Sequence, residues 1–174
     1  MSEYGEIVAP RTVRLERLLP GPVERVWEYL IDSEKRGAWL ARGEVEPRVG
    51  GRIELIWDND TLTPGDGGAP KGSGKSQMVG RVTQFDPPHT LAFLWTIDAA
   101  ETEVTFALAP AGEQVRLTIT HARLGDRGRL LSVSSGWHAH VGVLEDKLAG
   151  RAPRPFWGEV ERLAREYEGR LGQD

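Results

Sequence analysis

The stretch Gln114–Gly150, QVRLTITHARLGDRGRLLSVSSGWHAHVGVLEDKLAG, decides the fold because its hydrophobic period changes along the way. Its first part, up to His121, has an apolar residue at every second position, which predicts a strand with one buried face. Its second part predicts a long helix, capped by Ser134 or Ser135, that runs to the end of the stretch. Residues 123–133 between them are expected to be irregular. The helix presents an apolar stripe formed by Trp137, Val141, Leu144 and Leu148.

Upstream segments alternate in the same way and predict an antiparallel meander. The first expected strand, Thr12–Leu19, leads into two short helices. One has Pro22 in its first turn, and Asp32 or Ser33 caps the other, which runs to Leu40. The remaining strands are expected over Arg52–Trp57 and Gln77–Phe85, around Leu91, Phe93 and Trp95, and around Val104, Phe106 and Leu108, followed by a hairpin turn at Ala111-Gly112-Glu113.

The order of these elements indicates an α+β fold. Short links between strands, with the helices segregated from them in sequence, argue against a parallel doubly wound sheet. We expect a curved antiparallel sheet of six to seven strands wrapped around the long C-terminal helix. Two short helices follow strand one, and an extra helix lies at the C-terminus. This arrangement places a pocket between the sheet and the long helix.

The expected domain covers residues 1–150, and residues 151–174 form a helical extension. A joint bounded by prolines, Arg151–Pro155, leads into the last helix. The helix has an apolar stripe and two supporting charge pairs, made of Phe156, Val160, Leu163, Ala164, Tyr167 and Leu171, and of Glu161–Arg165 and Glu166–Arg170. Two arrangements remain open. The stripe packs on its own domain, or it forms a homodimer interface for which Trp157 is a candidate residue.

The composition excludes several classes of protein. The chain has 174 residues, 39% hydrophobic and 28% charged, as in folded globular domains. With no cysteine, it has no disulfide scaffold, thiolate metal site or cysteine nucleophile. A net charge of −4 gives no basic field for nucleic acid. No stretch has the ~18 apolar residues that insertion into a membrane requires. Because the first residues also lack the features of a signal peptide, a cytoplasmic location is expected.

Five short segments together resemble one protein family. They are Arg17–Trp27, Val49–Ile53, Gly80–Pro88, Leu117–His121 and Gly136-Trp137. In this order they resemble the START-like superfamily, also called SRPBCC or polyketide-cyclase-like, and its branch named for the activator of the heat-shock-protein-ninety ATPase. The resemblance spans about residues 10–150. It implies the helix-grip fold. The superfamily includes lipid carriers, hormone receptors, aromatases and cyclases, so the resemblance alone does not fix the function.

Face parity predicts which side chains reach the pocket. We expect them to bind a small hydrophobic or amphipathic ligand, without a catalytic residue. The candidates are Trp27, Trp39, Leu55, Trp57, Phe93, Trp95, Phe106, Leu117, Ile119, His121, Trp137, His140 and Val141. The alternative is that these residues fill a solid core. Several of the six tryptophans favour an opening, because large rigid rings pack poorly and a buried indole N–H needs a partner.

His121 has two interpretations. It orients a ligand or serves as the acid/base of a cyclase- or aromatase-type enzyme, or it is a core histidine whose nitrogens are satisfied by its neighbours. A third hypothesis for the protein is association with a chaperone. His138 and His140 lie about 200° apart around a helix, so they do not form a metal site. No metal and no cofactor are expected.

The segment from 58 to 75 is expected to be a long mobile loop, because it is rich in Asp, Gly and Pro. Within it, Gly68–Ser76 resembles a phosphate-binding P-loop. The motif requires a glycine where Ala69 stands, and it requires a following helix where a strand is expected. We therefore interpret this segment as a hairpin loop rather than a phosphate site.

Overall fold

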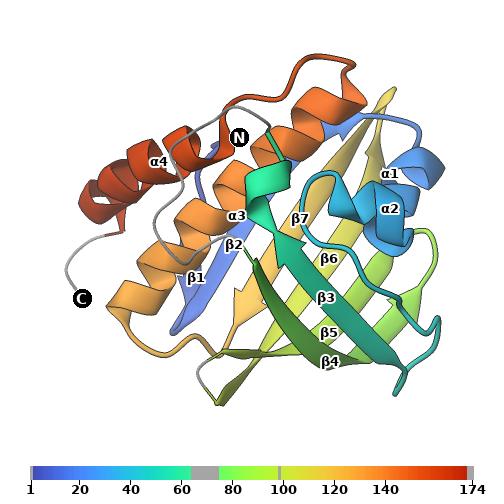
Figure 1. Ribbon diagram of the computed structural model, residues 1–174, viewed down its shortest axis with the longest axis horizontal. Coiled ribbons are helices and arrows are strands. Elements are labelled where there is room, and N and C mark those ends of the chain that lie inside the picture. The colour runs from blue at the N-terminus through green and yellow to red at the C-terminus, as the bar shows by residue number, and fades with distance from the viewer. Residues whose placement is uncertain (1, 64–74, 98, 172–174) are drawn as a thin grey trace.

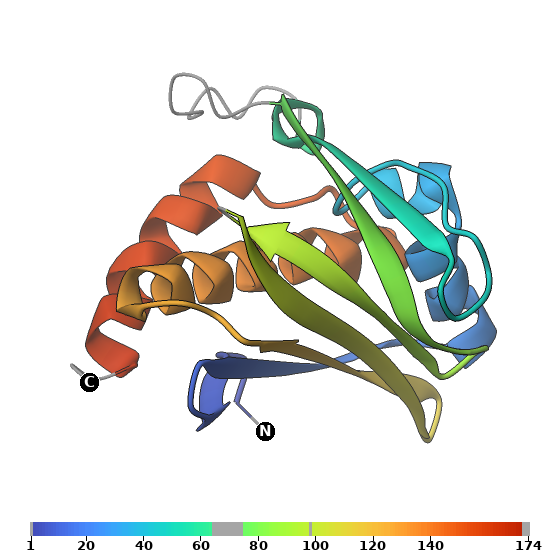
Figure 2. The same ribbon diagram turned by 90° about the horizontal axis from the view of Figure 1, so that it is seen from below.

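A curved seven-stranded antiparallel sheet holds a long helix in its concave face (Figures 1 and 2). The computed structural model describes residues 2–63, 75–97 and 99–171. The sheet order is β1-β2-β7-β6-β5-β4-β3. The elements are β1 Glu6–Ala9, β2 Thr12–Pro20, α1 Val23–Ile31, α2 Ser33–Gly37, β3 Arg52–Asp58, the 3₁₀-helix η1 Asn59–Thr61, β4 Lys75–Asp86, β5 Thr90–Ile97, β6 Ala100–Ala111, β7 Gln114–Ala122, α3 Arg127–Leu148 and α4 Phe156–Arg170. This confirms the expected α+β class.

The sheet faces follow the alternation of the sequence. Along β7, buried positions alternate with more exposed ones, and the buried His121 contacts Trp137 of α3. The β6–β7 hairpin turns at Gly112, which has a positive φ of 66°, as expected for a tight turn between these strands. The stripe of α3 is buried throughout, at Trp137, Val141, Leu144 and Leu148. Strand β1 was not expected, because it is short and exposed at all four positions.

Helix α3 begins earlier than the sequence suggested. It starts at Arg127, and Asp126 caps it by accepting the backbone N–H of Arg129 at 2.9 Å. The expectation that Ser134 or Ser135 caps this helix is therefore wrong. The hydroxyl of Ser135 instead donates to the Leu131 carbonyl one turn earlier, at 2.8 Å. Glycine and serine are weak helix formers, and tertiary packing of this segment outweighs their preference.

A buried arginine shapes the segment after α2. Arg36 has no exposed surface, and its guanidinium donates to the carbonyls of Leu30 and Ala41 at 3.0 Å each, and to that of Gly43. These bonds hold the end of α1 against the chain that enters the sheet. Helix α2 ends at Gly37 rather than at Leu40, and Asp32 caps it as expected. Burial lowers the Arg36 pKa to about 10.

Helix α4 packs on α3 (Figure 1). Its Phe156, Leu163 and Tyr167 belong to the main hydrophobic core. The joint before it is held by the Asp146 carboxylate, which accepts from Arg154 Nε at 2.8 Å and from Arg151 Nη2 at 3.1 Å.

The surface charges of α4 differ in part from expectation. Arg165 pairs with Glu161 at 3.3 Å as predicted. Glu166 pairs with Arg162 at 2.7 Å, whereas the expected partner Arg170 lies over the ring of Tyr4. The expected loop over 58–75 is wrong at its ends, because Asp58 ends β3, Asn59–Thr61 form a 3₁₀-helix and Lys75 begins β4; residues 64–74 lie outside the described residues.

Candidate functional site

A groove of about 440 Å³ opens beside α3, where β3 and β5 end and β4 begins. Its lining comes from the N-terminal half of α3, from the end of β3 with η1, and from the facing ends of β4 and β5. The lining residues are Leu40, Trp57, Asn59, Ser76, Gln77, Met78, Trp95, Thr96, Ile97, Arg129, Ser132, Val133, Gly136, Trp137 and His140. The hollow is large enough for a small organic molecule.

Stacked aromatic rings form one wall of the groove. Trp57 on β3 stacks on Trp95 on β5, with centroids 5.1 Å apart and 25° between the rings. The ring of His121 on β7 stacks on the same indole at 5.2 Å. From α3, Trp137 meets Trp95 edge-on at 5.6 Å. Three strands and one helix therefore contribute to a single aromatic assembly, and the indoles of Trp57, Trp95 and Trp137 line the groove itself.

Hydrogen bonds fix His121 behind this wall as a neutral imidazole. The Thr102 hydroxyl donates to the Trp95 carbonyl at 2.6 Å, so its oxygen accepts from His121 Nε2 at 2.7 Å. The other nitrogen, Nδ1, accepts from the Trp137 indole at 3.1 Å. His121 has no exposed surface, and burial lowers its pKa to about 3. It therefore orients the two indoles and has no nitrogen left for a ligand.

His140 lies on the α3 wall and is also neutral. Its Nδ1 donates to the Trp39 carbonyl at 2.7 Å, and its ring packs on Phe156 of α4 at 4.6 Å. Burial lowers the His140 pKa to about 4. Only 7% of the residue is exposed, and it lines the groove.

The family model described as Activator of Hsp90 ATPase homolog 1-like protein matches residues 20–149. The chain belongs to this family. The match confirms the resemblance to that branch of the START-like superfamily. Helix α4 lies beyond the matched region, so the family pattern does not include its contacts with η1 and His140.

Solved structures of other proteins share the fold of this chain. The protein encoded by gene BPP1335 from Bordetella parapertussis is 39% identical, with a TM-score of 0.78, over 99% of this chain and 94% of that one. CalU16 from Micromonospora echinospora is 19% identical, with a TM-score of 0.67, over 91% of this chain and 86% of that one. An HSP90 activator from Plasmodium falciparum, PFC0360w, is 18% identical, with a TM-score of 0.54, over 73% of this chain and 87% of that one. No curated protein matches the chain.

The structure brings only some of the predicted site residues of this family member together. Trp57, Trp95, Trp137 and His140 line the groove, and His121 lies behind them. Trp27 packs edge-on against Phe85 and does not line it. The other predicted residues are buried in the core, with at most 1% exposed: Trp39, Leu55, Phe93, Phe106, Leu117, Ile119 and Val141.

Sequence reasoning missed the polar residues of the lining. Asn59 follows β3 directly, and its Oδ1 is buried without a hydrogen-bond partner in the described part of the chain. Gln77 and Ser132 line the groove from β4 and α3. The available signal for Asn59 was a polar residue close after the strand of Trp57. It was missed because the whole segment 58–75 was interpreted as a loop.

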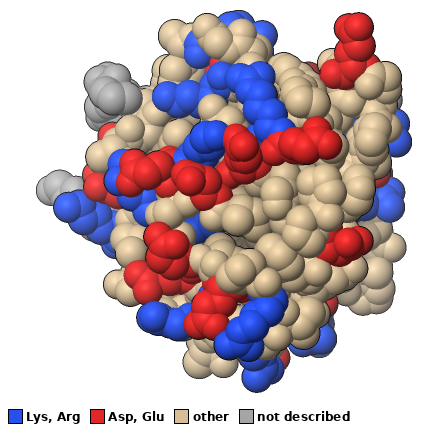
Figure 3. Space-filling model, turned by 90° about the vertical axis from the view of Figure 1, so that its right-hand side faces the viewer, with Lys and Arg blue, Asp and Glu red and all other residues tan. Residues whose placement is uncertain are grey.

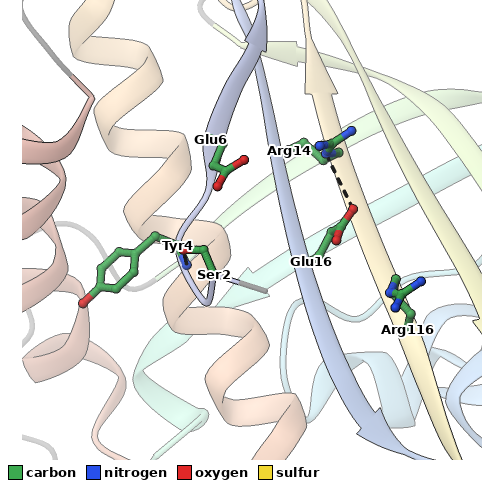
Figure 4. A pocket seen from close by; sticks show the side chains of 6 residues that line it. All are labelled: Ser2, Tyr4, Glu6, Arg14, Glu16 and Arg116. Carbon is green, nitrogen blue, oxygen red and sulfur yellow. Dashed lines mark hydrogen bonds and ion pairs between the residues drawn. The ribbon is translucent and has the colours of Figure 1, made fainter. Parts of the chain in front are cut away.

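A second hollow, of about 240 Å³, is charged and lies outside the sheet (Figure 4). Arg14 and Arg116 border it together with Glu6 and Glu16, and Arg14 pairs with Glu16 at 3.7 Å. Figure 4 shows Tyr4 turned away from this group. Cations and anions therefore neutralise one another here. The face in Figure 3 is similarly mixed, with Lys and Arg beside Asp and Glu.

Metal and membrane sites are not evident in the described ranges. Those residues contain no group of three or more His, Asp or Glu placed to hold a metal ion. His138 points to the other side of α3, where its Nδ1 accepts from the Tyr167 hydroxyl at 2.9 Å. Across the same ranges, no helix has both the length and the apolar character needed to cross a bilayer.

Proposed function

We propose that this protein binds a small hydrophobic or amphipathic molecule in the groove beside α3, without transforming it. The observation that carries the proposal is the aromatic wall. Trp57, Trp95 and Trp137 reach the groove, while the side chains behind them fill the core. An open groove bordered by indoles offers flat apolar surface to a ring or chain, and its polar rim offers orientation.

Burial of apolar surface supplies the binding free energy. A ligand that buries about 200 Å² against the wall gains roughly 5 kcal/mol, at 25 cal/mol per Å². Loss of translational and rotational freedom offsets part of this gain. The proposal therefore implies moderate affinity, with additional affinity from hydrogen bonds to the rim.

Binding without chemistry is favoured by the condition of His121. An acid/base in the pocket needs a free nitrogen and a pKa near the working pH. Both nitrogens of His121 are engaged, and its pKa is about 3. The cyclase hypothesis thereby loses its candidate residue. The chaperone hypothesis has in its favour the description of the matched family and the fold shared with the Plasmodium protein.

The test is a titration with N-phenyl-1-naphthylamine, an uncharged fluorescent probe of apolar sites. The matched variants are Trp57→Leu, in the groove, and Trp27→Leu, which alters an indole outside it. We expect saturable binding to the wild type, about tenfold weaker binding to Trp57→Leu and unchanged binding to Trp27→Leu. Absence of binding, or equal affinity in all three proteins, would refute the proposal.

A further inference from the structure

Two groups of the groove accept hydrogen bonds and receive none from the described protein. The first is His140 Nε2. A carbonyl oxygen only accepts, so the contact with the Trp39 carbonyl assigns the single proton of the neutral ring to Nδ1. The lone pair is then on Nε2, which has no hydrogen-bond partner among the residues that the structure describes. Phe156 packs against the ring and restrains its orientation.

The second acceptor is Asn59 Oδ1. It is buried and lacks a partner throughout the described ranges, and Asn59 lines the same groove as His140. A buried acceptor without a partner is costly, so a donor from a bound molecule or from water stabilises it. η1 itself is held in place, because the Trp157 indole donates to Asp60 Oδ1 at 3.0 Å. The unpaired oxygen therefore lies on an anchored segment.

We propose that the groove selects an uncharged aromatic ligand bearing a hydroxyl or N–H donor, and rejects the carboxylate of the same size. This inference rests on the proposed function and specifies its ligand. The aromatic wall accepts the ring, and one of the two acceptors receives the single hydrogen of the donor. A carboxylate brings no hydrogen to His140 Nε2 or Asn59 Oδ1, and it loses its hydration against the aromatic wall. Arg129 is the cation of the lining, and it already interacts with another part of the chain.

The neutral state of His140 supports the same selection. Burial lowers its pKa to about 4, so the ring does not gain a proton for a carboxylate near neutral pH. A ligand lacking a donor leaves unpaired the acceptor that a hydroxyl would serve, and sites of this kind discriminate strongly against such analogues.

Calorimetric titration of three naphthalenes of similar size tests this selection: 2-naphthol, 2-methoxynaphthalene and 2-naphthoate. Near neutral pH, we expect 2-naphthol to bind about tenfold more tightly than the ether, and the carboxylate to bind weakest. In His140→Phe the ratio of naphthol to ether affinity is expected to fall toward one. In Trp27→Leu, a control outside the groove, the ratio is expected to persist.

The outcomes separate this inference from the proposed function. Equal affinity for naphthol and ether, or tightest binding of the naphthoate, overturns the selection while leaving binding in the groove intact. If none of the three compounds binds, the proposed function fails and the inference fails with it. Asn59→Leu provides a second variant in case His140→Phe does not fold, and it is expected to reduce the same ratio. The inference is also overturned if the ratio of naphthol to ether affinity is unchanged in every one of these two variants that folds.

Discussion

Mild acid is expected to destabilise the protein through its buried histidines. His121, His138 and His140 all have lowered pKa values, about 3, 4 and 4, chiefly because of burial. Each is at most 7% exposed. The unfolded chain takes up these protons near pH 6.5, well above the pH at which the native chain does. Between these values the unfolded state binds more protons, so the free energy of unfolding falls as the pH falls.

The magnitude follows from the pKa differences. At about pH 5, the deeply buried His121 and His140 each lower the free energy of unfolding by roughly 2 kcal/mol relative to its value at about pH 8. His138 acts in the same direction. Asp146 has a pKa held below its usual range by Arg154, so its own effect begins only in stronger acid. The histidine window runs from about pH 6.5 down to about 3, so only its lower end overlaps the range of this carboxylate.

Urea unfolding at about pH 8 and about pH 5 measures the loss directly. We expect at least ~4 kcal/mol less stability at the lower pH, and a smaller loss in His138→Gln, whose amide oxygen still accepts from Tyr167. Proton NMR of the imidazole rings follows each site. A ring signal of His121 or His140 that titrates near pH 6.5 in the folded protein, or equal stability at both pH values, would refute the reasoning.

Two further predictions concern the segment between α2 and β3, and both are measured by urea unfolding. Arg36→Met leaves the carbonyls of Leu30, Ala41 and Gly43 without their donor and is expected to lower the free energy of unfolding by about 3 kcal/mol or more. The control Arg42→Met, at an exposed arginine, is expected to lower it by less than about 0.5 kcal/mol. Equal losses of stability would contradict the role of Arg36. Gly43→Ala places a Cβ 1.9 Å from the Glu54 carbonyl oxygen, at a φ of +125°. It is expected to lower the free energy of unfolding by well over the ~1 kcal/mol expected for Gly112→Ala, where φ is also positive but nothing lies within 4 Å. Similar losses of stability for the two variants would show that backbone conformation, not close approach, sets the loss.

The fold was largely predictable because burial leaves a period in the sequence. Buried residues recur at every second position in β7 and at helical spacing in the stripe of α3, so the pattern indicates the element type and its buried face. Strand β1 left no such signal, since its four residues are exposed. The start of α3 was misplaced because Gly128 and the serines favour loops locally, and only tertiary packing makes them helical.

The site was predictable only in part. Parity indicates which side of a strand a residue faces, but it does not distinguish a groove wall from a filled core. Trp57 and Leu55 share a face of β3, yet only Trp57 reaches the groove. Whether His121 is free or engaged depends on Thr102, a residue distant in sequence that pattern reasoning had no cause to select.

The stacking of Trp57 on Trp95 has an optical consequence. Two indoles with centroids 5.1 Å apart and rings inclined by 25° are close enough for their electronic transitions to couple. Such coupling splits a circular dichroism band into neighbouring positive and negative lobes. The pair forms part of the groove wall. A ligand that binds against either indole therefore changes the splitting of this band, so circular dichroism reports binding without an attached label.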